Sequence, residues 1–427
     1  MTLSLIFLLL FVLLILRMPI AFAMGISGFL GMALHIGWVP ALSILERTIF
    51  ESTSAFILVS IPLFILMAEF MSAGNMTQRT VSACQAWLGH MRGGIAVATV
   101  GAAVILAALV GSSTASSATM ASSAYPEMKR HGYADRLSAA IVSVGGTLAV
   151  LIPPSIVLIV YGVLTETSIG KLFIAGIIPG LLTASGLVIT VMLISRNPGM
   201  APAGQAFSLQ NALAKSRMFW PILILLVLVI ASIYTGFSSP TEAGAIGAAG
   251  ALLLALSQRT MTMMRFSGSL SATVRITVMI MAIVFCSMIF SNYLVMTRVT
   301  QDIITATKNS GLPPMVILFA IVGLLLILGM FLDQLAILSL TLPLTFPVIT
   351  ALGFDPVWFG IIVTKTVEIG LLTPPLGLNA YVTASQTGVP LKTVFRGIVP
   401  FLVAEVVVLL ILLLIPATVT WLPSQMR

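Results

Sequence analysis

Long apolar segments alternate with short polar stretches along the whole chain. A helix that crosses a bilayer needs about 20 mostly apolar residues, and segments of this kind recur from one end to the other. In the first half we expect spans near residues 2–16, 20–36, 56–73 and 172–195. In the second half we expect them near residues 219–236, 243–256, 277–295 and 395–416. The pattern predicts an all-α polytopic membrane protein.

Two further apolar segments are each interrupted by a pair of prolines. Residues 137–164 contain Pro153-Pro154, and residues 357–384 contain Pro374-Pro375. Proline has no N–H and prevents the helical bond to the carbonyl four residues earlier, so each pair breaks its helix. In lipid such a break is costly unless the exposed backbone lines a protected site. Paired broken helices are typical of the binding centre of a secondary transporter.

The two proline pairs belong to a repeat, because 374 − 153 = 221. The same shift matches further positions without a gap: Pro126 with Pro347, Gly132 with Gly353, Lys171 with Lys392, and Pro179 with Pro400. We therefore predict two copies of one unit, residues 1–204 and 219–427. A polar cytoplasmic linker is expected at residues 205–218.

Each copy also contains a shorter pair of apolar segments, at residues 93–126 and 313–347. The first is 34 residues long (126 − 93 + 1), which is short for two crossings and a turn. We expect a re-entrant helical hairpin in each copy instead. Each copy then crosses the membrane five times, an odd number, so the second copy must have inverted topology. The prediction is ten crossings, two hairpins that enter from opposite sides, and both termini outside.

The distribution of basic residues agrees with this inversion. Fourteen lysines and arginines fall in loops expected on the cytoplasmic side and five in loops outside, while Lys365 lies within a span. Positive loops favour the cytoplasmic side. The net charge of +8 is scattered singly over loops, which disfavours nucleic-acid binding.

Composition narrows the function classes further. Hydrophobic residues make up 59% of the chain and charged residues 7%, against about 25% charged in soluble domains. Cys84 and Cys286 are the only cysteines, and the three histidines form no group with metal-ligand spacing. We expect two buried thiols, no cofactor and no enzymatic activity, because no nucleophile–base pair or metal set is recognisable.

The two hairpin tips differ in chemistry. Residues 111–117 read Gly-Ser-Ser-Thr-Ala-Ser-Ser, which suits either close helix packing or a polar site. Under the shift, Ser112 matches Asp333, and a carboxylate in so apolar a segment needs a partner, of which a cation is the simplest. Carbonyls freed by the prolines are oxygen ligands suited to Na⁺. We predict two mirrored Na⁺ sites, one from Ser112 with Ala149, Ile152 and Pro154, the other from Asp333 with Gly370, Thr373 and Pro375.

Hairpin tips also present helix N-termini, which favour an anion. The space between the tips is therefore expected to hold an anionic substrate. Its candidate ligands are Ser113, Ser116, Gln334, Thr373 and Asn379. Lys365 and Glu368 are three apart on one helix, so we expect a structural ion pair, with a proton or substrate role as the alternative. Glu405 is expected to be an orienting or packing group.

At these motifs the chain resembles the large membrane subunit of the tripartite ATP-independent periplasmic (TRAP) transporters. The matching stretches are residues 111–113 with Ser116, 125–128, 132–133, 145–148, 151–155, 171–173, 175–180, 359–360, and 370–375 with Gly377. The resemblance implies Na⁺-driven uptake of an organic acid, such as a sialic acid, a C4-dicarboxylate or a sugar acid, across the bacterial inner membrane. It also implies an elevator motion, in which a transport domain holding both hairpins slides against a scaffold built from the other spans.

The same resemblance implies two partners. One is a small four-span membrane subunit, expected as a separate polypeptide, and the other is a soluble periplasmic binding protein that delivers substrate. Two positions depart from the family, since Ala149 stands where glycine is frequent and Thr366 where many members have asparagine. The alternative is a self-sufficient Na⁺/carboxylate or anion symporter. An ion channel is a different class, and an embedded enzyme is the least favoured interpretation.

Overall fold

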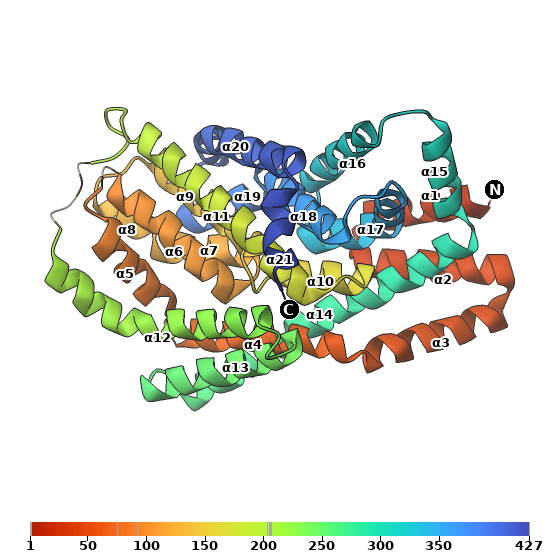
Figure 1. The fold of residues 1–427 in the computed structure, drawn as a ribbon, viewed down its shortest axis with the longest axis horizontal. Coiled ribbons are helices and arrows are strands. Elements are labelled where there is room, and N and C mark those ends of the chain that lie inside the picture. Colours follow the sequence, from red (N-terminus) through yellow and green to blue (C-terminus); the bar gives the residue numbers. More distant parts are fainter. Residues whose placement is uncertain (1, 75, 92, 203, 205–206, 427) are drawn as a thin grey trace.

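A computed structural model shows the chain as a set of helices joined by short loops (Figure 1). It describes residues 2–74, 76–91, 93–202, 204 and 207–426. The first half contains these elements: α1 (Thr2–Ile15), α2 (Ile20–Ile36), α3 (Trp38–Ser54), the 3₁₀ turn η1 (Phe56–Val59), α4 (Ser60–Ala73), α5 (Met76–Leu88), α6 (Gly94–Val110), α7 (Ser113–Ser123), α8 (Tyr125–Arg130), α9 (Asp135–Leu151), α10 (Ile156–Thr165) and α11 (Ile169–Ile194).

The second half repeats this order. It contains α12 (Leu209–Tyr234), α13 (Pro240–Ser257), α14 (Met263–Met296), α15 (Val299–Asn309), α16 (Pro314–Gly329), α17 (Gln334–Ala351), α18 (Pro356–Leu372), α19 (Leu378–Thr387), α20 (Leu391–Leu414) and α21 (Ala417–Ser424). Adding 221 to the bounds of α9 gives 356–372, which are the bounds of α18. The same shift moves α2 to 241–257 and α11 to 390–415, each within one residue of α13 and α20. The sequence repeat is therefore a repeat of helices.

Helices α1–α4 of the first half pack against helices α12–α14 of the second half. We call this group of helices the frame. α2 packs along α14 and α4 packs along α13, with α1 against α2 and α12 against α13. Small residues allow the closest approach, since a methyl group on Gly28 would lie 2.7 Å from the Cα of Phe290. In Figure 1 the frame runs along the lower and right-hand edges, with the N-terminus at its right end.

The second group, which we call the carrier, surrounds the two broken helices. Every residue from Leu137 to Leu151 in α9 and from Trp358 to Leu372 in α18 is buried. Helices that are apolar on all sides belong inside a larger bundle, and here α11 and α20 cover them. α7 contacts α9 of its own half and α19 of the other, while α17 contacts α18 and α10. Each hairpin therefore packs against both broken helices, the one in its own half and the one in the other half.

Most of the predicted spans, both hairpins and both broken helices are confirmed as helical elements. Seven helices are long and apolar enough to cross a membrane, or eight if the two segments of α12, bent by 58°, count as one span, within the residues that the structure describes. α1 and α2 are apolar but shorter. The count of ten crossings stays a prediction.

Some helices extend beyond the predicted spans. α12 begins at Leu209, inside the expected linker, whose residues 205–206 lie outside the described residues. α14 has 34 residues where the sequence suggested 277–295. Helices α3, α5 and α15 were not predicted at all. Each carries polar side chains among its apolar ones, so a search for long apolar runs passes over it.

Candidate ion and substrate site

The first helix break, between α9 and α10, is enclosed by protein. Pro153, Pro154 and Ser155 are buried, and the Ser155 hydroxyl donates to the Val150 carbonyl at 2.5 Å. This carbonyl is one of those that the prolines free from helical bonding. A side chain has therefore replaced the missing backbone donor, which leaves Ala149 as the freed carbonyl predicted to bind an ion.

The second break, between α18 and α19, is open to the surface. Pro374, Pro375 and Leu376 are exposed. The Thr373 backbone N–H donates to the Gly370 carbonyl at 3.0 Å, and the Thr373 hydroxyl donates to the Ile369 carbonyl at 2.6 Å. The two breaks thus share a backbone design but differ in exposure.

Each hairpin tip lies against the break of its own half, as predicted. Gly111 ends α6 with a φ of +63°, and a methyl group there would be 3.6 Å from the Pro154 carbonyl oxygen. This places the tip that carries Ser112 beside the first break. In the second half, a methyl group on Gly329 would be 2.9 Å from the Cα of Gly370. Tip and break meet there through two glycines with no side chain between them.

The environment of Asp333 differs from the prediction. We expected a carboxylate in an apolar span whose simplest partner would be a cation, but Asp333 is exposed and caps α17. Its Oδ1 accepts from the backbone N–H groups of Leu335 and Ala336, both at 2.9 Å. The first N–H groups of a helix have no intrahelical partner, so aspartate is favoured at this position. Within the described residues Oδ2 makes no hydrogen bond, and this oxygen can face an ion.

Three of the proposed substrate ligands lie near a buried polar group between α7, α9 and α19. The Asn379 Nδ2 donates to the Ser113 Oγ at 2.5 Å and to the Ser143 carbonyl at 3.4 Å. Ser143 in turn donates to the Thr383 hydroxyl at 2.8 Å. In the part of the chain that the structure describes, the Ser116 Oγ and the Asn379 Oδ1 have no partner. Sequence reasoning missed Ser143 and Thr383, because each is one of several hydroxyl residues in its helix and no local pattern sets it apart.

Gln334 and Thr373 lie on other elements. Gln334 is the buried first residue of α17, and its Oε1 has no partner among the described residues. No hydrogen bond within those residues joins Gln334 or Thr373 to the Ser113–Asn379 group. The structure therefore joins Ser113 and Asn379, but among the described residues it does not join all five predicted substrate ligands in one hydrogen-bonded group.

The expected ion pair is present and larger than predicted. Lys365 donates to Glu368 at 3.1 Å and to Thr183 at 2.9 Å, and it also pairs with Glu405. Glu405 was expected to be an orienting or packing group, and the structure shows that it is also a charged partner of Lys365. All four side chains are at most 1% exposed, so α18 is tied to α11 and α20 by a buried charge cluster.

Comparison with known proteins decides the family. The family model described as "Tripartite ATP-independent periplasmic transporter, DctM component" matches residues 7–418. The chain belongs to this family. Its members are transporter components rather than enzymes, and the resemblance found in the sequence is confirmed.

Individual TRAP proteins show the same likeness. The chain is 39% identical over 403 residues to the C4-dicarboxylate TRAP transporter large permease protein DctM of Pseudomonas aeruginosa, covering 94% of each. It is 31% identical over 415 residues to the sialic acid TRAP transporter permease protein SiaT of Haemophilus influenzae, covering 95% of this chain and 66% of that protein. The fold resembles the YdaH transporter of Alcanivorax borkumensis, with a TM-score of 0.64, 14% identity and 90% of each chain covered.

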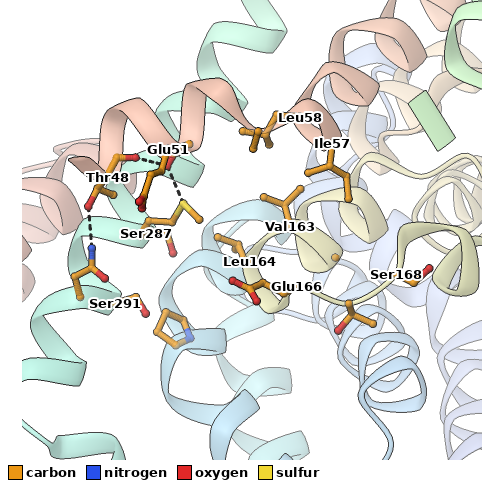
Figure 2. Close-up of a pocket in the computed structure, with 17 residues that line it drawn as sticks. Thr48, Glu51, Ile57, Leu58, Val163, Leu164, Glu166, Ser168, Ser287 and Ser291 are labelled. Atoms are coloured by element: carbon orange, nitrogen blue, oxygen red, sulfur yellow. Dashed lines mark hydrogen bonds between the residues drawn. The ribbon is translucent and has the colours of Figure 1, made fainter. Parts of the chain in front are cut away.

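In this TRAP permease a cavity of about 650 Å³ opens between the frame and the carrier. Figure 2 shows Glu51 of α3 and Ser287 and Ser291 of α14 on one side, and Leu164 and Glu166 at the end of α10 on the other. Among the described residues that line it, two are acidic and none is basic. The volume would suit a small organic molecule, but the charge does not suit an anion. We therefore assign the cavity to the boundary between the frame and the carrier, and not to the predicted anion site.

Proposed function

We propose that this chain is the large permease of a Na⁺-coupled TRAP transporter that imports an organic acid anion across the bacterial inner membrane. The observation that carries the proposal is the pairing of each hairpin tip with a helix break, at Gly111–Pro154 and at Gly329–Gly370, in a chain of the TRAP family. The substrate class follows from relatives named for C4-dicarboxylates and sialic acid.

The two tip–break contacts are the proposed Na⁺ sites. The first uses Ser112 with the backbone of Ala149, Ile152 and Pro154, and the second uses Asp333 with Gly370, Thr373 and Pro375. Hydroxyl, carboxylate and carbonyl oxygens are the ligands that suit such ions at broken helices. The second site carries the only charged ligand of the two, so Asp333 is expected to dominate Na⁺ dependence.

The substrate is proposed to bind between the two tips. α7 and α17 both begin at a tip. The N-terminus of α7, whose N-cap Ser112 makes no side-chain capping bond, supplies N–H groups and a positive dipole end, whereas Asp333 already accepts from two N–H groups of α17. Ser113 and Ser116 belong to the first hairpin, and Ser113 accepts from Asn379 of α19. Gln334 begins α17 of the second hairpin, and Thr373 follows the end of α18. Ser116, Asn379 and Gln334 each retain an unpartnered polar atom within the described residues, which a substrate could satisfy.

Transport is proposed to occur by an elevator motion of the carrier against the frame. The hairpins pack on broken helices from both halves, so these elements should move together. α11 and α20 are joined to α18 by packing and by the Lys365 cluster, so they should travel with the carrier and not with the scaffold, where we had expected them. The cavity at the boundary between the frame and the carrier gives this motion room.

The family name makes this chain one component of a tripartite transporter. We infer that the others are a small four-span membrane subunit and a periplasmic binding protein. Inverted repeats with both termini in the periplasm complete the proposed topology. A self-sufficient symporter without a binding protein is the alternative.

Reconstitution tests the proposal. The permease and its small subunit are placed in proteoliposomes with the binding protein outside, loaded with a carboxylate that raises the binding protein's melting temperature. An inward Na⁺ gradient should drive accumulation, and a Na⁺ ionophore should abolish it. Equal accumulation under a proton gradient without Na⁺ would contradict Na⁺ coupling. Full uptake without the binding protein would favour the self-sufficient symporter.

A further inference from the structure

A groove on the surface of the carrier combines basic and apolar side chains. It has a volume of about 510 Å³ and lies between α20 and the second helix break. Its charged residues are Lys392 and Arg396, and the other described residues that line it are apolar: Pro374, Leu391, Phe395, Val399 and Leu402. No acidic side chain is among these described residues. The charge of this groove is therefore opposite to that of the cavity between the frame and the carrier.

The two basic residues of the groove lie together without a counter-charge. They are four apart near the start of α20, so they share one face of the helix. Both are exposed, and within the residues that the structure describes neither side chain makes an ion pair. A third cation is close, since Arg136 Nη2 donates to the Arg396 backbone carbonyl at 2.8 Å. Cations are disfavoured near a helix N-terminus, and the first turn of α20 has no acidic residue to offset them. An external anion would supply the missing partner.

The apolar residues of the groove continue from these cations along the same helix. α20 is one of the helices that are long and apolar enough to cross a membrane. Val399 is 56% exposed, so protein does not cover this face of the helix. From Lys392 to Leu402 the helix rises about 15 Å, at about 1.5 Å per residue. Cations at the end of a span, followed by an uncovered apolar wall, match the order of headgroup and acyl chain in a lipid.

The first half of the chain shows that a helix break does not by itself produce this groove. Under the shift of 221, Lys392 matches Lys171, whereas Arg396 matches the buried Ala175. The prolines of the matching break are buried as well. The first half therefore keeps one cation but has neither the second cation nor the open apolar wall.

We propose that this groove binds an anionic phospholipid, with its headgroup phosphate on Lys392 and Arg396 and an acyl chain along Phe395, Val399 and Leu402. Phosphate oxygens accept charge-assisted hydrogen bonds from ammonium and guanidinium groups, and basic pockets at the membrane surface select anionic headgroups. The concave apolar wall holds the chain by close packing. A small organic acid has no such chain, so it does not account for this wall.

The bound lipid would contact the second helix break. Pro374 forms part of the groove wall. Phe395 lies against Gly377, where a methyl group would be 2.6 Å from its Cε1 atom. Gly377 follows the proline pair and precedes α19 with a φ of +53°. The lipid would therefore be held by the carrier alone, at the break that the repeat has left exposed.

Native mass spectrometry of the purified full-length permease tests this proposal without requiring transport. After delipidation, the protein is mixed with equal amounts of phosphatidylglycerol and phosphatidylcholine that have the same acyl chains. The most tightly retained lipid should be phosphatidylglycerol, with a preference of about tenfold or more. Lys392→Gln combined with Arg396→Gln should abolish this preference. Lys171→Gln combined with Lys308→Gln removes two exposed charges elsewhere and should keep it.

A second pair of variants tests the acyl chain and leaves every charge in place. Val399→Trp fills the groove and should abolish retention of phosphatidylglycerol. Val407→Trp, at an exposed position of α20 outside the groove, is the matched control and should retain the lipid. The proposal is overturned if the two double variants lose the preference equally, or if Val399→Trp binds as the wild type does. Displacement of the lipid by soluble glycerol phosphate would also overturn it, because the site would then bind an anion without a chain.

Discussion

The two helix breaks share one backbone design but differ in their surroundings. At the first, Pro153 and Pro154 are buried and the Ser155 hydroxyl holds the Val150 carbonyl. At the second, Pro374 and Pro375 are exposed, and the shift of 221 replaces Ser155 by Leu376. The repeat has therefore kept the break and changed what completes it.

This difference suggests that the two copies contribute differently to the proposed ion sites. The first break is closed by a neutral hydroxyl at Ser155 and a neutral tip at Ser112, so it resembles a fixed element of the carrier. The second break is open and lies in the half whose tip carries the charged Asp333. In the proposed elevator motion, the exposed second break is the part of the two sites that differs most in accessibility from the buried first break.

Asp333→Asn should produce the largest loss of Na⁺-activated uptake. A smaller loss than that of Ser112→Ala would contradict the proposed difference between the two sites. The change keeps the side chain's size and its acceptor for the α17 cap but removes the charge offered to Na⁺. We expect Na⁺ activation of uptake to weaken by at least tenfold while the protein stays folded, a loss of about 1.4 kcal/mol. Ser112→Ala at the closed break should be milder. Unchanged Na⁺ activation in both variants would remove these residues from the ion sites.

Gly370→Ala tests the contact between the second tip and its break. The new methyl would lie 2.5 Å from the Cα of Gly329, and two backbones cannot yield as a side chain can. We expect a cost of about 1–3 kcal/mol and loss of most uptake. Gly323→Ala on α16 is the control, because nothing lies within 4 Å of that position. Equal melting temperatures for the two variants would show that the tip is not seated on Gly370.

Cysteine labelling can sharpen the contrast in exposure. In a background with Cys84 and Cys286 replaced by alanine, Leu376→Cys should react quickly with a water-soluble maleimide. Ser155→Cys, at the matching position, should react far more slowly because residue 155 is fully buried. Comparable rates at the two positions would mean that the breaks are equally accessible in solution.

Ser155→Ala should have the smallest effect on Na⁺-dependent uptake in the series. It leaves the Val150 carbonyl without its side-chain donor, which costs about 1–3 kcal/mol for a buried group. The melting temperature of the purified protein should fall, while Na⁺ activation should stay as in the wild type. Leu376→Ala is the control for loss of side-chain volume at an exposed position, and a larger fall for Leu376→Ala would contradict the proposed cap.

Much of the fold could be predicted from the sequence because its strongest signals are local. Proline pairs break helices wherever they occur, and a gapless shift relates one half to the other. The bounds of α9 and α18 accordingly agree at that shift. Helix α3 escaped prediction because polar residues interrupt its apolar ones, as they do in many loops.

The side-chain partners could not be predicted, since they depend on packing between distant segments. Glu405 meets Lys365 from 40 residues away, and Asn379 meets Ser113 from 266 residues away. The exposure of Asp333 depends in the same way on how the second hairpin lies in the carrier, which no local pattern encodes. Its capping role follows from its place before α17, but the apolar residues around it suggested a position inside a span.

The proposed transport mechanism requires that the two copies have inverted orientations in the membrane, and one measurement tests this orientation directly. Arg130 and Ala351 are both exposed and occupy matching positions, since 351 − 130 = 221. In the cysteine-free background, Arg130→Cys and Ala351→Cys would each be labelled in intact cells with a membrane-impermeant reagent, before and after permeabilisation. We predict labelling of Ala351→Cys in intact cells and of Arg130→Cys only after permeabilisation. Labelling of both from the same side would contradict the inverted repeat and the transport mechanism built on it.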